Sequence, residues 1–257
     1  MKNINLNSDI GEGFGVYDIG NDTDMLKIVN SANIACGFHA GDPNVMDRVV
    51  KQSIKNGVSI GAHPGFNDLW GFGRRQIHMS ADEIEASVAY QIGALQAISA
   101  TNNAIVTHVK PHGALNNMSS LDPDIAAAIA RGVNLVNPKL ILVAVSGSFL
   151  FSAGQALGLT VAAEAYADRS YEDDGNMTSR KYDHAMIKDP ERAAAQVRNI
   201  VINGYIIANS GKKVPVKADT ICIHGDEPTG PAVAQAVRKM LESEGISVKP
   251  LPDLNLV

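Results

Sequence analysis

The stretch ANIACGFHAGDPNVM, residues 32–46, contains in order an apolar run, a histidine between two glycines, and the start of a helix. Asp42 followed by Pro43 is a strong helix-start signal, because the aspartate caps free N–H groups and proline fits the first helical position. The signal explains Asp42 and Pro43, but it gives no structural reason for His39. The stretch therefore predicts a strand, a tight turn that carries a polar residue, and a helix.

Six further apolar runs resemble the one that opens this stretch, and each is short enough to be a strand. Strands that are mostly apolar on both faces are typical of a parallel sheet covered by helices. Helix signals lie between the runs, including a capping box at residues 80–83 and Asp-Pro pairs at residues 122–123 and 189–190. The seven predicted strands are INLNS, ANIAC, VSIGA, AIVTHV, LILVAV, LTVAA and TICIH.

The alternation of strands and helices predicts one α/β domain over residues 1–257, a parallel β/α barrel of seven strands. Residues 246–249 are a candidate eighth strand, whose place the sequence leaves open. The alternative is an open doubly wound sheet, which the same alternation also allows. We expect the long polar segment at residues 166–188 to form an elaborate loop over one end.

Composition excludes several classes of protein. The chain has 22 lysines and arginines against 27 aspartates and glutamates, a net charge of −5, and no basic stripe, which argues against a nucleic-acid partner. Its two cysteines, Cys36 and Cys222, lie in apolar runs and predict reduced, buried thiols in the cytoplasm. No signal peptide and no run of about 18 apolar residues is present, so no membrane contact is expected. A homo-oligomer is left open.

Unusual polar clusters follow the predicted strands directly. In parallel α/β folds the C-terminal ends of the strands open onto one face, and active sites form there. Clusters that are distant in sequence can therefore meet at one site. They are NSDIGEGFG, CGFHAGDP, GAHPGFNDLWGFGRR, HVKPHGALNN, AEAYADRSY and IHGDEPTGP.

The clusters supply candidate catalytic and binding residues. Histidines and carboxylates beside glycine or proline at strand ends suit general acid–base work, whereas the alternatives are turns, helix caps and solvated side chains. Arginine and lysine in the same loops could hold a carboxylate or phosphate, the alternative being plain surface charge. The catalytic candidates are Asp9, His39, His63, His112, Glu164 and His224. The substrate-binding candidates are Glu12, Arg75, Lys110 and Arg169.

A divalent metal is a further hypothesis, with Asp9, His39 and His63 as ligands from three separate strand ends. Established zinc spacings give it no support, because His108 and His112 are separated by Pro111 and cannot share a helix face. We interpret His108 as a core histidine. Neither a dinucleotide fingerprint nor a G-x-x-x-x-G-K-[ST] loop is present, so any nucleotide is held by other means.

The long motifs NSDIGEGFG, ANIACGFHAGDP, GAHPGFNDLWGFGRR, VKPHGALNN and HGDEP resemble those of the LamB/YcsF family, which supplies the A component of bacterial 5-oxoprolinase. The resemblance implies ATP-dependent opening of 5-oxoproline to L-glutamate together with partner subunits B and C. It also implies a seven-stranded β/α barrel similar to those of the glycoside hydrolase/deacetylase superfamily. Under this hypothesis Asp9, His39 and His63 orient the attacking water, and Lys110 or Arg75 holds the substrate carboxylate.

Two other functions stay open at this point. One is a stand-alone metal-dependent deacetylase that acts on acetylated sugars. The other is a non-catalytic binding or scaffold protein, which the gathering of ionisable groups at one barrel end disfavours, because structure alone does not require it.

Overall fold

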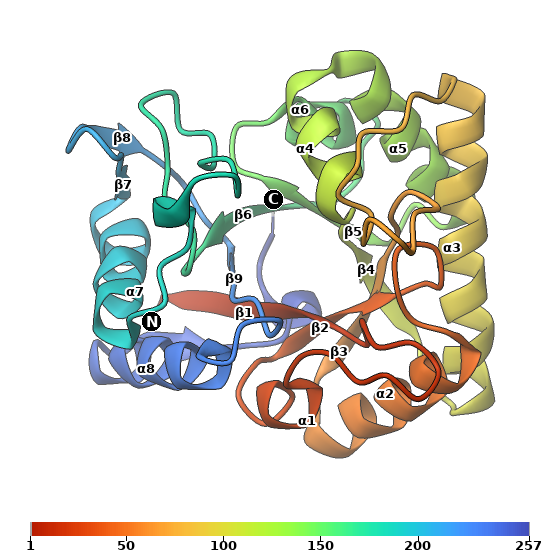
Figure 1. The fold of residues 1–257 in the computed structure, drawn as a ribbon, viewed down its shortest axis with the longest axis horizontal. Coiled ribbons are helices and arrows are strands. Elements are labelled where there is room, and N and C mark those ends of the chain that lie inside the picture. The colour runs from red at the N-terminus through yellow and green to blue at the C-terminus, as the bar shows by residue number, and fades with distance from the viewer. Residues whose placement is uncertain (1, 257) are drawn as a thin grey trace.

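Seven parallel strands pair side by side and close into a ring in the order β1–β2–β3–β4–β5–β6–β9, with β9 pairing back onto β1 (Figure 1). The computed structural model describes residues 2–256, so the terminal residues 1 and 257 of the predicted domain lie outside it. The closed ring confirms the predicted barrel and excludes the open sheet. Its strands are β1 (Asn3–Ile10), β2 (Ser31–Ala35), β3 (Ser59–His63), β4 (Val106–Val109), β5 (Ile141–Val145), β6 (Val161–Tyr166) and β9 (Thr220–Cys222).

Three further strands lie outside the ring. The candidate eighth strand is present as β10 (Ser247–Val248), which pairs in parallel with the first residues of β1. An antiparallel hairpin of β7 (Tyr205–Ile207) and β8 (Lys213–Pro215) was not predicted. Its strands are three residues long, which is too short for the alternation of apolar and polar residues that identifies a strand in a sequence.

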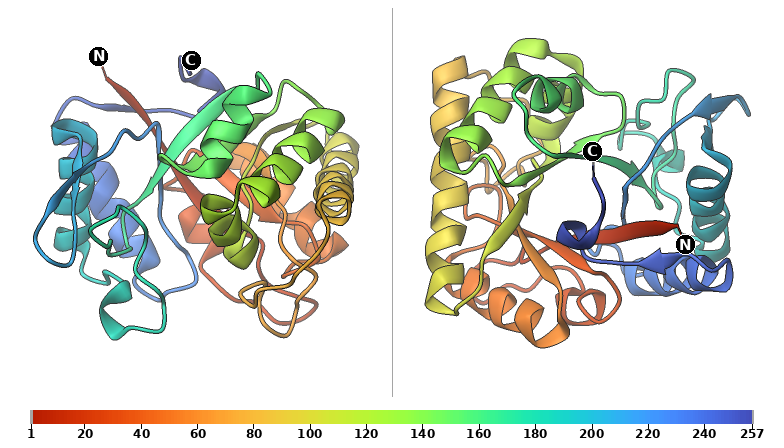
Figure 2. Two further views of the ribbon diagram at one scale, coloured as in Figure 1. Left: turned by 90° about the horizontal axis from the view of Figure 1, so that it is seen from above. Right: turned by 180° about the vertical axis from the view of Figure 1, so that it is seen from behind.

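Helices cover the outside of the ring, and the loops that follow the strands gather on one face (Figures 1 and 2). Both termini lie on the opposite face (Figure 2). Within residues 2–256, no helix combines the length and the apolar character needed to cross a membrane. The helices are α1 (Asp22–Met25), α2 (Pro43–Asn56), α3 (Ala81–Thr101), α4 (Gly113–Leu121), α5 (Pro123–Val136), α6 (Phe149–Ala156), α7 (Pro190–Arg198) and α8 (Gly230–Ser243).

Helix α2 begins where the sequence predicts. The Asp42 carboxylate accepts hydrogen bonds from the backbone N–H groups of Asn44 and Val45 at 2.8 and 3.0 Å. The same side chain accepts a third bond, 2.7 Å long, from the backbone of Gly15 in the loop after β1. Asp42 therefore caps α2 and also ties that helix to the first polar loop.

The centre of the barrel is polar, although the strands were expected to be mostly apolar on both faces. Asn5 donates to Ser31 at 2.8 Å, and Asn7 donates to Thr220 at 2.7 Å. Thr220 donates in turn to Asn5, and Asn33 donates to Asn7 at 2.8 Å. All five side chains are fully buried, so these hydrogen bonds replace those that water would make, although the side-chain oxygen of Asn33 has no partner within residues 2–256.

We predict that Asp42→Ala lowers the free energy of unfolding by about 1 kcal/mol, the usual value of a lost helix cap. Urea midpoints measure the change. The matched control is Asp82→Ala, which removes an exposed acidic residue from the first turn of α3 but no cap. Equal midpoints for the two variants would show that Asp42 does not stabilise the helix start.

Candidate active site

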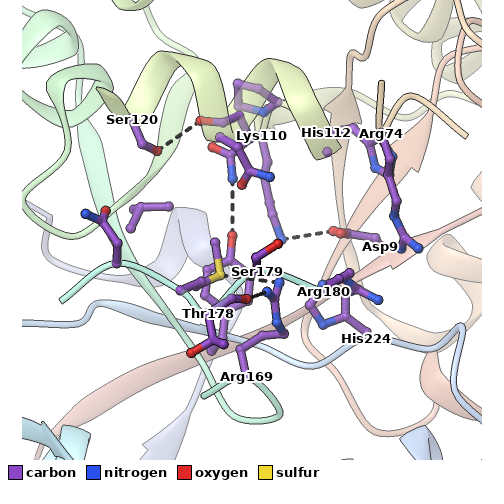
Figure 3. Close-up of a pocket in the computed structure, with 18 of the residues that line it drawn as sticks. Asp9, Arg74, Lys110, His112, Ser120, Arg169, Thr178, Ser179, Arg180 and His224 are labelled. Carbon is purple, nitrogen blue, oxygen red and sulfur yellow. Dashed lines mark hydrogen bonds and ion pairs between the residues drawn. The ribbon is translucent and has the colours of Figure 1, made fainter. Parts of the chain in front are cut away.

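A pocket of about 690 Å³ opens at the barrel end where the strands finish (Figure 3). The polar loop at residues 166–188 supplies one of its walls, as expected. Seven of the ten predicted site residues line the pocket, so the distant clusters do converge. These seven are Asp9, Glu12, His63, Lys110, His112, Arg169 and His224.

Two histidines in the pocket have their tautomers fixed by backbone carbonyls. His63, the last residue of β3, has Nδ1 2.6 Å from the Lys110 carbonyl oxygen. His112, just before α4, has Nε2 2.8 Å from the Phe72 carbonyl oxygen. A carbonyl only accepts, so these nitrogens donate, and the other nitrogen of each neutral ring carries a lone pair. The two lone-pair nitrogens, His63 Nε2 and His112 Nδ1, lie 3.0 Å apart.

The carbonyl that fixes His112 comes from a strained loop. Phe72 has a φ of 54°, a left-handed conformation that is costly for a bulky side chain. Its ring packs edge-on against the His112 ring, with centroids 5.2 Å apart. Backbone strain of this kind persists where the surrounding structure holds it, often at functional sites.

Two carboxylates complete this cluster. Glu12 Oε1 lies 3.2 Å from His112 Nδ1 and 4.0 Å from His63 Nε2, and Asp9 Oδ2 lies 3.2 Å from His63 Nε2. Burial alone would raise both pKa values. Hydrogen bonding at Glu12, which accepts from His39, holds its pKa well below its ordinary value, and the Lys110 ammonium lowers the pKa of Asp9. Both groups are therefore carboxylate anions at neutral pH.

His39 lies behind the pocket lining. Its contacts there give the reason for a histidine in the turn between β2 and α2. Its Nε2 donates to Glu12 Oε1 at 3.1 Å, and its ring stacks on His112 at 3.6 Å. Within residues 2–256 its Nδ1 has no hydrogen-bond partner. Gly65 is required beside it, because a Cβ there would lie 2.7 Å from Nδ1. Gly41, with a φ of 78°, lets the chain turn into the helix after the histidine.

Lys110 is a buried cation just below the pocket surface (Figure 3). Its Nζ lies 3.0 Å from each of three acceptors, Asp9 Oδ1, Glu164 Oε1 and Cys222 Sγ. Burial alone would lower the Lys110 pKa, but the surrounding negative groups, Asp9 first, raise it well above its ordinary value. Lys110 therefore stays charged and orients Asp9.

Glu164 was predicted to be a catalytic acid or base, but the structure places it beneath the pocket and not on its lining. Its side chain is buried, and its Oε1 accepts from Asn7 at 3.0 Å as well as facing Lys110. The carboxylate therefore balances the charge of Lys110. The strand pattern located Glu164 correctly, but the direction of its side chain depends on barrel register.

His224 is oriented by a residue that the sequence patterns did not single out. Both oxygens of Asp168 lie close to His224 Nδ1, at 2.9 and 3.0 Å, and one also accepts from the His224 backbone N–H at 2.9 Å. Nδ1 is therefore the protonated nitrogen, and Nε2 is left for the pocket. His224 in turn lowers the pKa of Asp168 against the raising effect of burial. The only signal for Asp168 was its position in the AEAYADRSY cluster.

The predicted arginines do not play the expected part. Arg75 is not among the residues that line the pocket, because its guanidinium pairs with buried Asp68 and its side chain is 68% exposed. Arg169 lines the pocket, but its guanidinium donates to the backbone carbonyls of Thr178 and Ala185 and so braces the loop.

Arg74 and Arg180 supply the free positive charge in the pocket instead (Figure 3). Both contact the same Asp226 oxygen, Arg74 at 2.9 Å and Arg180 at 3.7 Å. Two guanidiniums share one carboxylate, so a net positive charge remains for an anionic ligand.

The buried state of His39 predicts a pH dependence of stability. Burial and the neighbouring His112 lower the His39 pKa from 6.5 to about 3. Between these values the unfolded chain binds a proton that the folded chain does not, so stability falls as pH is lowered below about 6.5. Each such proton contributes about 1.4 kcal/mol per pH unit. We expect His39→Asn to flatten the fall in urea midpoint between pH 6 and 4, measured in a chelator.

The matched control is His78→Ala, which removes an exposed histidine and should leave the pH slope of the wild-type chain unchanged. A His39→Asn protein with the full wild-type slope would show that His39 is not buried in its neutral form.

Three comparisons place the chain among known proteins. Residues 4–256 match the model of the LamB/YcsF family. The chain is 49% identical to the A component of the 5-oxoprolinase of Natranaerobius thermophilus over 251 residues, which cover 98% of each chain. A solved lactam utilization protein from Thermus thermophilus superposes with a TM-score of 0.92 at 42% identity, covering 98% of this chain and all of that one.

A more distant similarity concerns the fold alone. The structure of a deacetylase with substrate superposes with a TM-score of 0.51 at 13% identity, covering 98% of this chain and 89% of that one. The two proteins thus share the barrel fold. The match of the family model over nearly the whole length and the close relatives show that this chain belongs to the LamB/YcsF family.

Proposed function

We propose that this chain is the A component of an ATP-dependent 5-oxoprolinase, which opens the lactam of 5-oxo-L-proline to L-glutamate. ATP is converted to ADP and phosphate by the complex with subunits B and C. The observation that carries the proposal is the relative of that name, 49% identical over 98% of both chains. The pocket supports it, because its groups match the needs of amide hydrolysis.

Opening a lactam requires an activated water molecule at the carbonyl carbon. In this proposal the Asp9 carboxylate accepts the proton of that water at Oδ2, because Lys110 holds Oδ1. Asp9 Oδ2 lies 3.2 Å from His63 Nε2, at the edge of the cluster that His63 forms with Glu12 and His112. A divalent cation bound among these groups would in addition polarise the carbonyl oxygen.

The ring nitrogen of the lactam needs a proton as the C–N bond breaks. His224 supplies it from Nε2, the nitrogen left for the pocket. Asp168 is a positioning residue: it holds Nδ1 in its protonated form and stabilises the imidazolium. Acid and base thus come from different strand ends, β9 and β1.

The substrate carries one carboxylate. Arg180 and Arg74 bind it in this proposal, in place of the predicted Arg75 and Lys110, because Arg75 pairs elsewhere and Lys110 already has three partners. ATP is bound by the partner subunits, in line with the missing phosphate-binding loop in this sequence.

The test is reconstitution. The purified chain, candidate subunits B and C, 5-oxoproline and ATP are mixed, and glutamate is assayed. We expect glutamate only when all components are present. Robust ATP-dependent turnover by the isolated chain would contradict the requirement for subunits B and C. Deacetylation of acetylated sugars by the chain with added metal would favour the alternative function.

We predict that Asp168→Asn lowers the turnover number of the reconstituted complex by about 10²-fold or more, the usual range for loss of acid–base help. The KM for 5-oxoproline should change little, because Asp168 faces His224. The control Asp183→Asn removes an exposed carboxylate from the same loop and should change neither the turnover number nor the KM. A fully active Asp168→Asn complex would remove His224 from the proposed role of acid.

A further inference from the structure

Several hydrogen-bond acceptors in the pocket face one another with no donor from the described residues between them. His63 Nε2 and His112 Nδ1 face each other at 3.0 Å, and both carry lone pairs because backbone carbonyls take the ring protons. The carboxylates of Asp9 and Glu12 lie beside them. Three of these acceptors, His63 Nε2, His112 Nδ1 and Glu12 Oε1, lie within 4.0 Å of one another, and they repel one another unless a cation lies among them.

The separations between these atoms suit a bound metal. Two ligand atoms held at about 2.0–2.1 Å from a divalent cation, at angles between octahedral and tetrahedral, lie about 2.8–3.4 Å apart. The distance between His63 Nε2 and His112 Nδ1 is 3.0 Å, and each nitrogen is 3.2 Å from its nearest carboxylate oxygen. The two imidazole planes are almost perpendicular, at 87°, so their edges converge.

His39 does not share this geometry, although its Nε2 is close to the cluster. Its ring is stacked on His112 at 3.6 Å and only 4° from parallel. A ligand histidine binds a metal in the plane of its ring, and one ion cannot lie in two parallel planes that far apart. His39 Nε2 already donates to Glu12, so its contact with the cluster passes through that carboxylate.

We propose that a divalent first-row transition metal binds between His63, His112 and Glu12, and that His39 is a positioning residue that holds Glu12. This set of two imidazoles and one carboxylate is typical for such ions. It replaces the ligand set predicted from the sequence, Asp9, His39 and His63, and it deepens the proposed function, whose active site is the same pocket.

The groups around the ligands support the assignment. Metal-binding histidines donate their second N–H to a carbonyl or carboxylate, which fixes the ring and the tautomer. The carbonyls of Lys110 and Phe72 do this for His63 and His112. Lys110 Nζ binds Asp9 Oδ1, which leaves Oδ2 free beside His63.

Cobalt(II) is the probe for this site. The chain is stripped with a chelator, and Co²⁺ is titrated while visible absorption, bound metal per chain and thermal midpoint are recorded. The wild-type chain should bind one ion with a visible band and a raised midpoint, and His63→Ala and His112→Ala should abolish the band. His39→Gln, whose side-chain amide reaches the position of Nε2 and can still donate to Glu12, should keep one ion with affinity lowered about 10–100-fold. The control His78→Ala should behave as wild type.

Three results would overturn the proposal: a wild-type chain that binds no ion, a His63→Ala chain that binds as wild type, or a His39→Gln chain that loses the band as completely as His112→Ala. Far-UV circular dichroism checks that the variants are folded, and the isosteric Glu12→Gln, which should weaken the band, serves if an alanine variant unfolds. The assay needs neither partners nor turnover. A chain that binds cobalt here but yields no glutamate in the reconstituted mixture would refute the proposed function alone.

Discussion

Three acceptors outside the rings decide which nitrogen of each pocket histidine is free: the carbonyls of Lys110 and Phe72 and the carboxylate of Asp168. Each acceptor belongs to a strand end or to the loop after it. The chemistry of the pocket therefore depends on barrel closure, because a one-residue slip in register would turn a different side chain or carbonyl towards it.

The polar centre of the barrel holds a buried positive charge, that of Lys110, next to the Asp9 carboxylate. Lys110 is held between Asp9 and Glu164, and the buried amides of Asn7 and Asn33 connect this group to the layer below. Removing one partner from a buried ion pair costs about 3–5 kcal/mol, because the other charge is left without compensation. The network thus resists rearrangement, and it keeps Asp9 ionised beside His63.

The sequence predicted the seven barrel strands, the helix start at Asp42 and the gathering of polar clusters at one face, because these features follow from local patterns. It did not predict side-chain pairing. Glu164 and Arg75 were assigned from the strand or loop that carries them, yet Glu164 lies beneath the pocket and Arg75 pairs with Asp68. Asp168 was missed for the same reason, since only the fold brings it to His224.

The chemistry of the site depends on which ring nitrogen of His63, His112 and His224 carries the proton. ¹⁵N NMR of the imidazole rings of the metal-free chain measures this directly. Long-range ¹⁵N–¹H correlations distinguish the two neutral tautomers of a histidine. The structure predicts a proton on Nδ1 of His63, on Nε2 of His112 and on Nδ1 of His224. A neutral His63 ring with its single proton on Nε2, or a neutral His112 ring with its single proton on Nδ1, would mean that the backbone carbonyls do not fix these rings, and would contradict the proposed chemistry of the site.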